Sequence, residues 1–332
     1  MKQQSLASLT YEGMKKRTKR EKFLSEMEQV VPWERLLKLI EAHYPKAGKG
    51  RQPMGLNVML RIYCLQQWYG LSDPGAEEAL YDMEAMRRFA GLELGEDVIP
   101  DETTILSFRH LLEQHNLTNA VFEAVKAYLT EQGLLLAGGS IVDATIIHAP
   151  PSTKNQAKQR DPEMSSTKKG NTWHFGMKAH ISVDANSGLI HTVGITTASD
   201  HDSSVIGELV REDDRAVFGD KGYYNDQTKQ AARKAGVYWA VLDKAKRSRK
   251  LSASQRKRNK KHASVRAKVE HVFRIVKCQF GYRKTRYKGI AKNKMGMKTL
   301  LLPFGDFQLN GKFSIELFRD FLIVKSCLYR FR

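Results

Sequence analysis

Apolar residues in the first part of the chain recur every three or four positions, which is the spacing of an amphipathic helix. This pattern covers residues 20–133, and residues 33–40 are one example of it. Ser72 and Asp101 stand where helix N-caps are expected, just before new apolar repeats begin. The sequence therefore predicts an all-α domain over residues 20–133, after a basic arm over residues 1–19.

The spacing changes after this domain to the alternation that is typical of β-strands. A β-branched apolar segment comes first, and two alternating segments around an Asp-Ala-Asn-Ser-Gly turn then predict a hairpin. The expected strands are 140–147, 175–184, 189–197, 216–220 and 237–242, and helices are expected from near residue 202, over 227–235 and from about residue 263. The polar stretch 152–172 is expected to be a loop. Strands that alternate with helices in this order predict an α/β layered domain.

Positive charge is concentrated in one segment of the chain. The 332 residues carry 55 Lys and Arg against 36 Asp and Glu, which gives a formal net charge of +19. Residues 244–294 hold 20 of these basic residues and a single acid, Glu270, whereas the rest of the chain is balanced at 35 against 35. A balanced body with one intensely basic segment favours a polyanionic partner, and nucleic acid is the usual one.

The most basic part of this segment, residues 246–262, cannot bury itself. Its position just before the helix of Glu270 favours contacts with the DNA backbone. The candidate DNA contacts are Lys246, Arg247, Arg249, Lys250, Arg256, Lys257, Arg258, Lys260 and Lys261. The alternative is a solvated run of charge without a partner, which is the commonest meaning of such runs.

Cysteine and histidine residues do not indicate a disulfide framework or a zinc site. Cys64, Cys278 and Cys327 are too few and too scattered, which fits a reducing compartment. No segment has the apolar run of a signal peptide or a membrane helix, so a cytoplasmic, nucleoid-associated protein is expected. Five histidines lie between residues 148 and 201 without a zinc-ligand spacing, and we expect them to face solvent or phosphate.

Two aspartates, Asp143 and Asp220, stand at positions in predicted strands where a carboxylate is unusual or indicates a ligand site. Asp143 interrupts an apolar β-branched strand, where an unpaired charge is costly. Asp220 ends a short apolar strand between two glycines, and open α/β sheets place ligands at such strand ends. Each has an ordinary alternative, since Asp143 would cap a turn at an exposed strand end and Asp220 would be a common strand-to-loop aspartate.

Glu270 lies in the middle of the helix that follows the basic run. The apolar residues of this helix form one stripe, which predicts that this face packs on the sheet. The stripe consists of Val265, Val269, Val272, Phe273, Val276 and Phe280. At about 100° per residue, Arg266, Glu270 and Lys277 fall within roughly 40° of one another along its edge. The alternative is a solvated Arg266–Glu270 pair, worth about 0.3–0.5 kcal/mol.

Three acids gathered by a fold suit the cleavage of a phosphodiester. Two magnesium ions about 3.5–4 Å apart activate a water or a 3′-hydroxyl and stabilise the leaving oxygen. Magnesium prefers oxygen ligands and keeps several waters, so two or three carboxylates from separate elements are enough. Asp143, Asp220 and Glu270, on two strands and a helix, are such a set.

Several longer segments are recognisable motifs. IVDATIIHAPP, GNTWHFGMKAHISVDANSGLIHTV, TTASDHDSS, FGDKGYYN and VEHVFRIVK follow one another along the second half of the chain. In this order they resemble the DDE transposases of bacterial insertion sequences, specifically the family named after insertion sequence five. MLRIYCLQQWYGLSDPGAEEALYD and IPDETTILSFRHLLE are similar to the N-terminal domain of that family, so the resemblance covers about residues 15–302.

The resemblance implies a fold and a site. The fold is α/β, a ribonuclease H-like mixed sheet flanked by helices over residues 138–302, preceded by the all-α domain. Asp143, Asp220 and Glu270 are implied to be the catalytic, magnesium-binding triad, with manganese as a substitute.

Related elements also carry a Tyr-x2-Arg-x3-Glu-x6-Lys signature around the glutamate. Arg266 and Lys277 match it and are implied to contact phosphate, whereas Ala263 stands at the tyrosine position. This departure leaves the triad intact and removes any role for a tyrosine there.

The implied function is that of a DNA transposase. Such a protein binds the terminal inverted repeats of its element, cleaves the strands with a metal ion and joins them to target DNA, as a homodimer or higher multimer on DNA. The helical domain either reads the DNA ends through a helix-turn-helix near Ser72 or makes dimer contacts.

Residues 303–332 depart from the family pattern, since the resemblance stops within a few residues of Leu302. We hypothesise that the reading frame was altered or fused there, and a family-like tail in another frame of the gene would support this. The alternative function is a decayed, catalytically inactive transposase that acts only as a DNA-binding protein. A metal nuclease without strand transfer is a third possibility.

Overall fold

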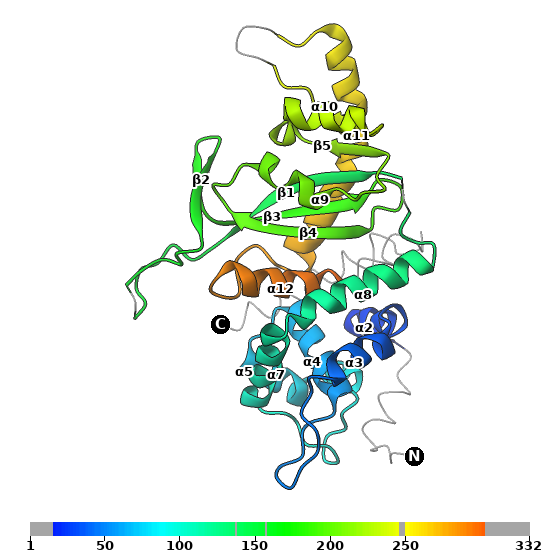
Figure 1. The fold of residues 1–332 in the computed structure, drawn as a ribbon. Coiled ribbons are helices and arrows are strands. Elements are labelled where there is room, and N and C mark those ends of the chain that lie inside the picture. Colours follow the sequence, from blue (N-terminus) through cyan, green and yellow to red (C-terminus); the bar gives the residue numbers. More distant parts are fainter. Residues whose placement is uncertain (1–15, 137, 157, 246–249, 303–332) are drawn as a thin grey trace. The chain divides into compact units, whose positions relative to one another are not determined.

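A computed structural model describes residues 16–136, 138–156, 158–245 and 250–302. This part of the chain forms two compact units. The first contains the residues up to Tyr128 together with those from Gly296, and the second contains Leu129–Met295 (Figure 1). The predicted arm over residues 1–19 and the atypical tail over residues 303–332 lie wholly or mostly outside the described residues.

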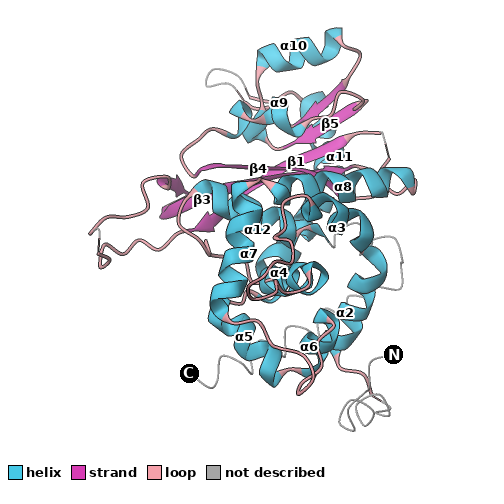
Figure 2. Ribbon diagram, turned by 60° about the horizontal axis from the view of Figure 1, so that its bottom comes forward, coloured by secondary structure: helices cyan, strands magenta, loops and turns pink. Residues whose placement is uncertain are grey.

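The N-terminal region is all-helical, as predicted. Its helices are α2 (Lys19–Val30), α3 (Trp33–Glu41), α4 (Leu56–Tyr69), α5 (Asp73–Asp82), α6 (Glu84–Ala90), α7 (Glu102–Gln114) and α8 (Leu117–Glu131). Ser72 and Asp101 cap α5 and α7 by accepting the backbone N–H groups of Gly75 and Thr104, at 3.1 and 2.7 Å. Nearly every residue of α4 from Met59 onward is buried, and Figure 2 shows α3, α5, α6 and α7 arranged around it.

A mixed six-stranded sheet follows. Its strands are β1 (Ser140–His148), β2 (Ser165–Lys169), β3 (Thr172–Asp184), β4 (Ile190–Thr197), β5 (Ala216–Gly219) and β6 (Tyr238–Val241). The order is β2-β3-β1-β5-β6, and β4 also pairs with β3. β1 is antiparallel to β3 and parallel to β5, and β5 is parallel to β6. An all-α region followed by such a sheet with helices is the arrangement of a ribonuclease H-like core, as predicted.

Helices and helical turns lie between and after the later strands. They are η1 (Asp202–Ser204), α9 (Ile206–Leu209), η2 (Lys221–Tyr223), α10 (Asp226–Lys234), α11 (Ala253–Arg274), the π-helical turn η3 (Ile275–Gln279) and α12 (Ile290–Leu300). α11 contacts β1, β3 and β5. Its predicted stripe is buried at Val269, Val272, Val276 and Phe280, whereas Val265 and Phe273 are only half-buried. A second apolar cluster joins Val142 of β1 to α9 and to Tyr223 of η2.

The expectation of a loop over the whole polar stretch before the hairpin is wrong. Residues Ser165–Lys169 form β2, which pairs antiparallel with the first residues of β3. Periodicity did not show this strand, because three of its five side chains are exposed and none is fully buried.

The long helix also begins earlier than expected. α11 begins at Ala253 and not near residue 263. Its N-cap is Ser252, whose hydroxyl accepts the Gln255 N–H while the Gln255 side chain accepts the Ser252 N–H. Lysine and arginine are good helix formers, so the basic residues extend α11 without needing to be buried.

The helix expected from near residue 202 is short. It consists of the 3₁₀ turn η1 and the four-residue α9. Among the described residues no helix has both the length and the apolarity needed to cross a bilayer.

Candidate active site

Asp143 lies inside β1, opposite Ile181 of β3, and not at the end of the strand. Only 15% of its side chain is exposed. Its Oδ1 accepts the backbone N–H of Ala144 at 2.9 Å. Burial raises the pKa of Asp143 to about 6, although the positive charge of Arg266 opposes this shift.

Asp220 follows β5 directly. Because β5 runs parallel to β1 and pairs Gly219 with Val142, Asp220 emerges beside Asp143 on the neighbouring strand. A Cβ atom on Gly219 would lie 3.1 Å from a Val142 methyl and 3.3 Å from a Val241 methyl, so a glycine allows the close approach of these strands. The Asp220 side chain is 47% exposed.

Arg266 and Glu270 lie one turn apart on α11. Arg266 Nη2 donates to Glu270 Oε1 at 2.9 Å, and the same guanidinium lies 3.5 Å from Asp143 Oδ2 and 3.6 Å from Asp220 Oδ1. Burial lowers the pKa of Arg266, but the carboxylates outweigh it, and the pKa is raised above its ordinary value. One guanidinium therefore lies among three carboxylates that come from two strands and a helix.

This arrangement has the chemistry of a divalent-cation site. Carboxylate oxygens are the donors that magnesium prefers. Three ionised carboxylates against one guanidinium leave a formal charge of −2, which a divalent ion would balance. In the described part of the chain, however, no three His, Cys, Asp or Glu side chains are close enough together to hold an ion. The donor types fit a metal ion, and the guanidinium stands among the donors.

The sequence analysis did not identify the residues that support the loop of Asp220. Lys178 Nζ donates to Asp202 Oδ1 at 3.0 Å, and a Cβ on Gly222 would lie 2.7 Å from Asp202 Oδ2. His180 Nδ1 lies 3.1 Å from the Tyr223 hydroxyl. Burial, and then the charges of nearby aspartates, raises the pKa of Tyr223. η1 and β3 thus fix the turn that carries Asp220. In the sequence, only the recognisable segments TTASDHDSS and GDKGYY pointed to the residues of this turn and of η1.

Lys277 lies in the π-helical turn η3, beyond the end of α11. Burial lowers its pKa, and the positive charges of Lys169 and Arg283 lower it further. The 40° projection assumed an uninterrupted α-helix, whereas a π turn changes the angle per residue. The charged side chains that act most on Lys277 are therefore the cations Lys169 and Arg283, and not the three acids.

The basic run is only partly described, because Lys246, Arg247 and Arg249 lie outside the described residues. The remaining candidates are exposed: Lys250, Arg256, Lys257, Arg258, Lys260 and Lys261. Arg258 pairs with Asp243 at 2.9 Å, and the Asn259 side chain bonds both the N–H and the carbonyl oxygen of Asp243. These contacts anchor the first turns of α11 and leave its other cations facing solvent.

A buried polar cluster at the start of β1 has the residue types of a hydrolase triad. The Ser140 hydroxyl donates to Asp214 and lies 2.8 Å from His191 Nε2. Arg211 pairs with Asp214 and with Asp184 at 3.0 and 3.2 Å. The side chains of Ser140, His191 and Asp214 are almost completely buried, so this cluster joins strands and has no access for a substrate.

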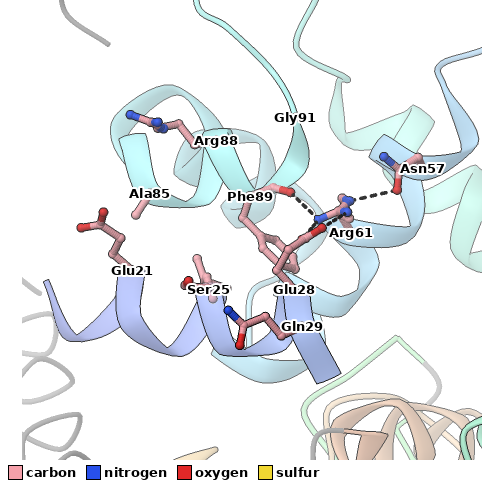
Figure 3. Close-up of a pocket in the computed structure, with 11 residues that line it drawn as sticks. Glu21, Ser25, Glu28, Gln29, Asn57, Arg61, Ala85, Arg88, Phe89 and Gly91 are labelled. Carbon is pink, nitrogen blue, oxygen red and sulfur yellow. Dashed lines mark hydrogen bonds and ion pairs between the residues drawn. The ribbon is translucent and has the colours of Figure 1, made fainter. Parts of the chain in front are cut away.

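The helical unit contains a cleft of about 520 Å³ between α2, α4 and α6 (Figure 3). Its central cation, Arg61, pairs with Glu28 and donates to Asn57 Oδ1 and to the Phe89 carbonyl oxygen. Its guanidinium also lies 4.5 Å from the centre of the Trp33 ring. Arg61 therefore ties these helices together, and its polar groups are already used.

The fold and these residues define a class: a ribonuclease H-like domain with three convergent carboxylates. Comparison with known families agrees with this class. The chain belongs to the family described as the transposase DDE domain, whose model matches residues 136–302. A second family model, described as a transposase domain (DUF772), matches residues 12–111. DNA transposition is therefore the activity that family membership indicates.

Proposed function

We propose that the protein is a DNA transposase of the family named after insertion sequence five. It binds the terminal inverted repeats of its own element, cleaves the DNA strands and joins the freed ends to target DNA. The observation that carries this proposal is the convergence of Asp143, Asp220 and Glu270 around Arg266. Membership in the transposase DDE domain family supports the same reaction class.

In this proposal Asp143, Asp220 and Glu270 are the catalytic residues and hold magnesium, for which manganese substitutes. The bound metal supplies an activated water or 3′-hydroxyl and stabilises the leaving oxygen. Asp143 lies within β1 with 15% of its side chain exposed, whereas Asp220 and Glu270 are 47% and 64% exposed, so in this proposal the latter two face the DNA.

The proposed DNA contacts are all to the backbone. Arg266 contacts a phosphate at the acids, Lys277 contacts one farther along the strand but still near the active site, and the cations of residues 246–261 contact phosphates on the other side. The helical domain over residues 20–133 binds the DNA ends or another copy of the chain, so the active species on DNA is a homodimer or a higher multimer.

Cleavage of the repeats that flank the gene tests the proposal. Purified protein is incubated with magnesium or manganese and a duplex that carries these repeats, and the cut strands are mapped. Asp143→Asn, Asp220→Asn and Glu270→Gln should each abolish cleavage and leave binding largely intact. Asp213→Asn, which changes a largely exposed carboxylate elsewhere on the same unit, is the matched control and should cut normally.

Each other outcome has a definite meaning. Cleavage at near wild-type rate in any of the three variants refutes the assignment of the site. Binding of the repeats without cleavage by the wild type indicates a decayed copy that acts as a DNA-binding protein. Cleavage without joined products indicates a metal nuclease.

A further inference from the structure

The hairpin of β2 and β3 extends beyond the rest of the sheet. β1 pairs with β3 from Asp184 only as far as Gly176, and β4 pairs with it only as far as Met177. The first four residues of β3 therefore pair with β2 alone, and Figure 1 shows β2 at the edge of the sheet. A Cβ on Gly176 would lie 2.1 Å from the Ile147 carbonyl oxygen, so the ribbon leaves the sheet at a residue that must be glycine.

One face of this ribbon carries Lys169 and His174. Lys169 pairs in register with Thr172, and Thr167 pairs with His174, so these side chains share a face. His174 Nδ1 lies 2.8 Å from Nε2 of His148, the last residue of β1. This contact places the face against the end of β1.

The segment after α11 brings further cations to the same place. His148 N–H donates to the Arg283 carbonyl oxygen at 3.0 Å, and its own carbonyl oxygen accepts the Thr285 N–H at 2.8 Å. Burial lowers the pKa of His148, and the charges of His174, Lys277 and Lys284 lower it further. We call this group the ribbon patch; it consists of His148, Lys169, His174, Lys277, Arg283 and Lys284.

No described acid compensates the patch. None of its four Lys and Arg side chains forms an ion pair with another described residue, and the Arg283 guanidinium donates only to the Lys277 carbonyl oxygen and to Cys278 Sγ. Burial lowers the pKa of Lys277 most, and repulsion from Lys169 and Arg283 lowers it further; an anion would relieve this repulsion and a metal ion would increase it. The patch is therefore suited to phosphate and not to zinc.

The position of the patch indicates a polymer and not a small anion. His148 follows Asp143 by five residues, about 16 Å along β1 and on the alternate face of that strand, and Lys277 follows Glu270 by seven residues, roughly 10 Å, where α11 passes into η3. Two rigid elements thus run from the acids to the patch. Successive phosphates of one strand rise about 3.4 Å along the duplex axis, so an interval of about 10–16 Å along that axis corresponds to about three to five nucleotides.

We propose that the ribbon patch binds the phosphodiester backbone of the DNA strand about three to five nucleotides from the phosphate at the acids. This inference rests on the proposed function for the identity of that phosphate. The patch reads no sequence, because lysine and arginine contacts to the backbone carry none. It therefore holds element DNA and unrelated DNA equally.

Binding measured in the presence of a chelator tests the inference separately from cleavage. Full-length wild type, Lys169→Gln and Lys284→Gln are titrated with labelled repeat DNA and with unrelated duplex of the same length, at several salt concentrations. Each variant should weaken binding to both DNAs about eight-fold near 0.1 M salt and flatten the slope of log K against log salt by about 0.9. Lys234→Gln, an exposed lysine of α10, is the control and should keep the wild-type slope.

Two results would overturn the inference. An unchanged salt slope in Lys169→Gln and Lys284→Gln removes the backbone contact, and a loss confined to repeat DNA shows base reading instead. Lys169→Arg, which retains the charge, should restore the slope and so separates loss of charge from loss of fold. If cleavage fails altogether in the earlier experiment, a flattened slope still establishes the patch as a DNA contact, although its distance from the cut then has no reference.

Discussion

Replacement of Arg266 tests the electrostatic coupling of the three carboxylates directly. Arg266→Gln keeps a polar side chain and removes the charge that lies 2.9–3.6 Å from Asp143, Asp220 and Glu270. In the absence of divalent ions the variant should be less stable than the wild type. In the presence of divalent ions the stability of the variant should recover, because a bound metal ion then balances the carboxylates and no guanidinium has to be displaced.

The size of the loss follows from burial and from protonation. The pKa of Asp143 is already about 6 with Arg266 present, so without Arg266 this carboxyl can take up a proton. At about pH 7, protonation of Asp143 costs about 1.4 kcal/mol, since the pH lies about one unit above its pKa, and this cost limits the loss that removal of Arg266 causes at Asp143. The Asp220 and Glu270 side chains are 47% and 64% exposed, so solvent screens each pair with Arg266, and each adds only about 0.3–0.5 kcal/mol. The expected destabilisation is therefore about 2 kcal/mol.

Urea unfolding with a chelator, and again with manganese, measures both effects. A metal ion at about 100 times its Kd stabilises the folded state by about 2.7 kcal/mol, and this gain should be larger in Arg266→Gln than in the wild type. Arg274→Gln removes an exposed arginine from the same helix and serves as the control. Equal stability of Arg266→Gln and wild type in chelator, or an equal response of both to manganese, would refute the reasoning.

Two further predictions concern the support of Asp220. Gly222→Ala places a Cβ 2.7 Å from Asp202 Oδ2, so strand cleavage should fall at least ten-fold while binding to repeat DNA, measured by anisotropy, stays within about two-fold; equal loss of both would show general damage. His180 is buried, and burial lowers its pKa to about 4. The neutral imidazole therefore contributes fully to the free energy of unfolding above its ordinary pKa of 6.5. This contribution is lost as the pH falls toward 4, by up to about 3 kcal/mol. The stability difference between wild type and His180→Gln, measured by urea unfolding, should therefore shrink over this pH range, and a constant difference would contradict the assignment.

Local patterns were enough to predict most elements. The N-caps Ser72 and Asp101 and the turn between β3 and β4 act within a few residues, so the sequence shows them directly. β2 was missed because its stabilisation comes from pairing with β3 and not from a buried face. The start of α11 was missed because exposed lysine and arginine residues have no apolar periodicity.

The candidate site was predictable in its parts and not in its assembly. A carboxylate in an apolar strand and a lone acid in a basic helix drew attention to Asp143 and Glu270 from the sequence. That Arg266 reaches Asp143 and Asp220 depends on how α11 crosses β1 and β5, which is a tertiary contact. The contact of His180 with Tyr223 joins residues 43 positions apart and has no local pattern.

The distribution of charge along α11 explains why Glu270 is the single acid in the basic segment. The exposed cations from Arg256 to Lys261 precede Glu270 by 9 to 14 residues, and Lys277 follows it by seven. At about 1.5 Å per residue, cationic surface therefore lies about 14–21 Å before Glu270 along α11, and Lys277 lies after it, just beyond the end of α11 in η3. A strand that follows α11 would be held on both sides of the phosphate at the acids, which is the placement that accurate positioning of a cut requires. Another acid within this interval would repel the backbone, which is consistent with the proposed catalytic role of the single acid that is present.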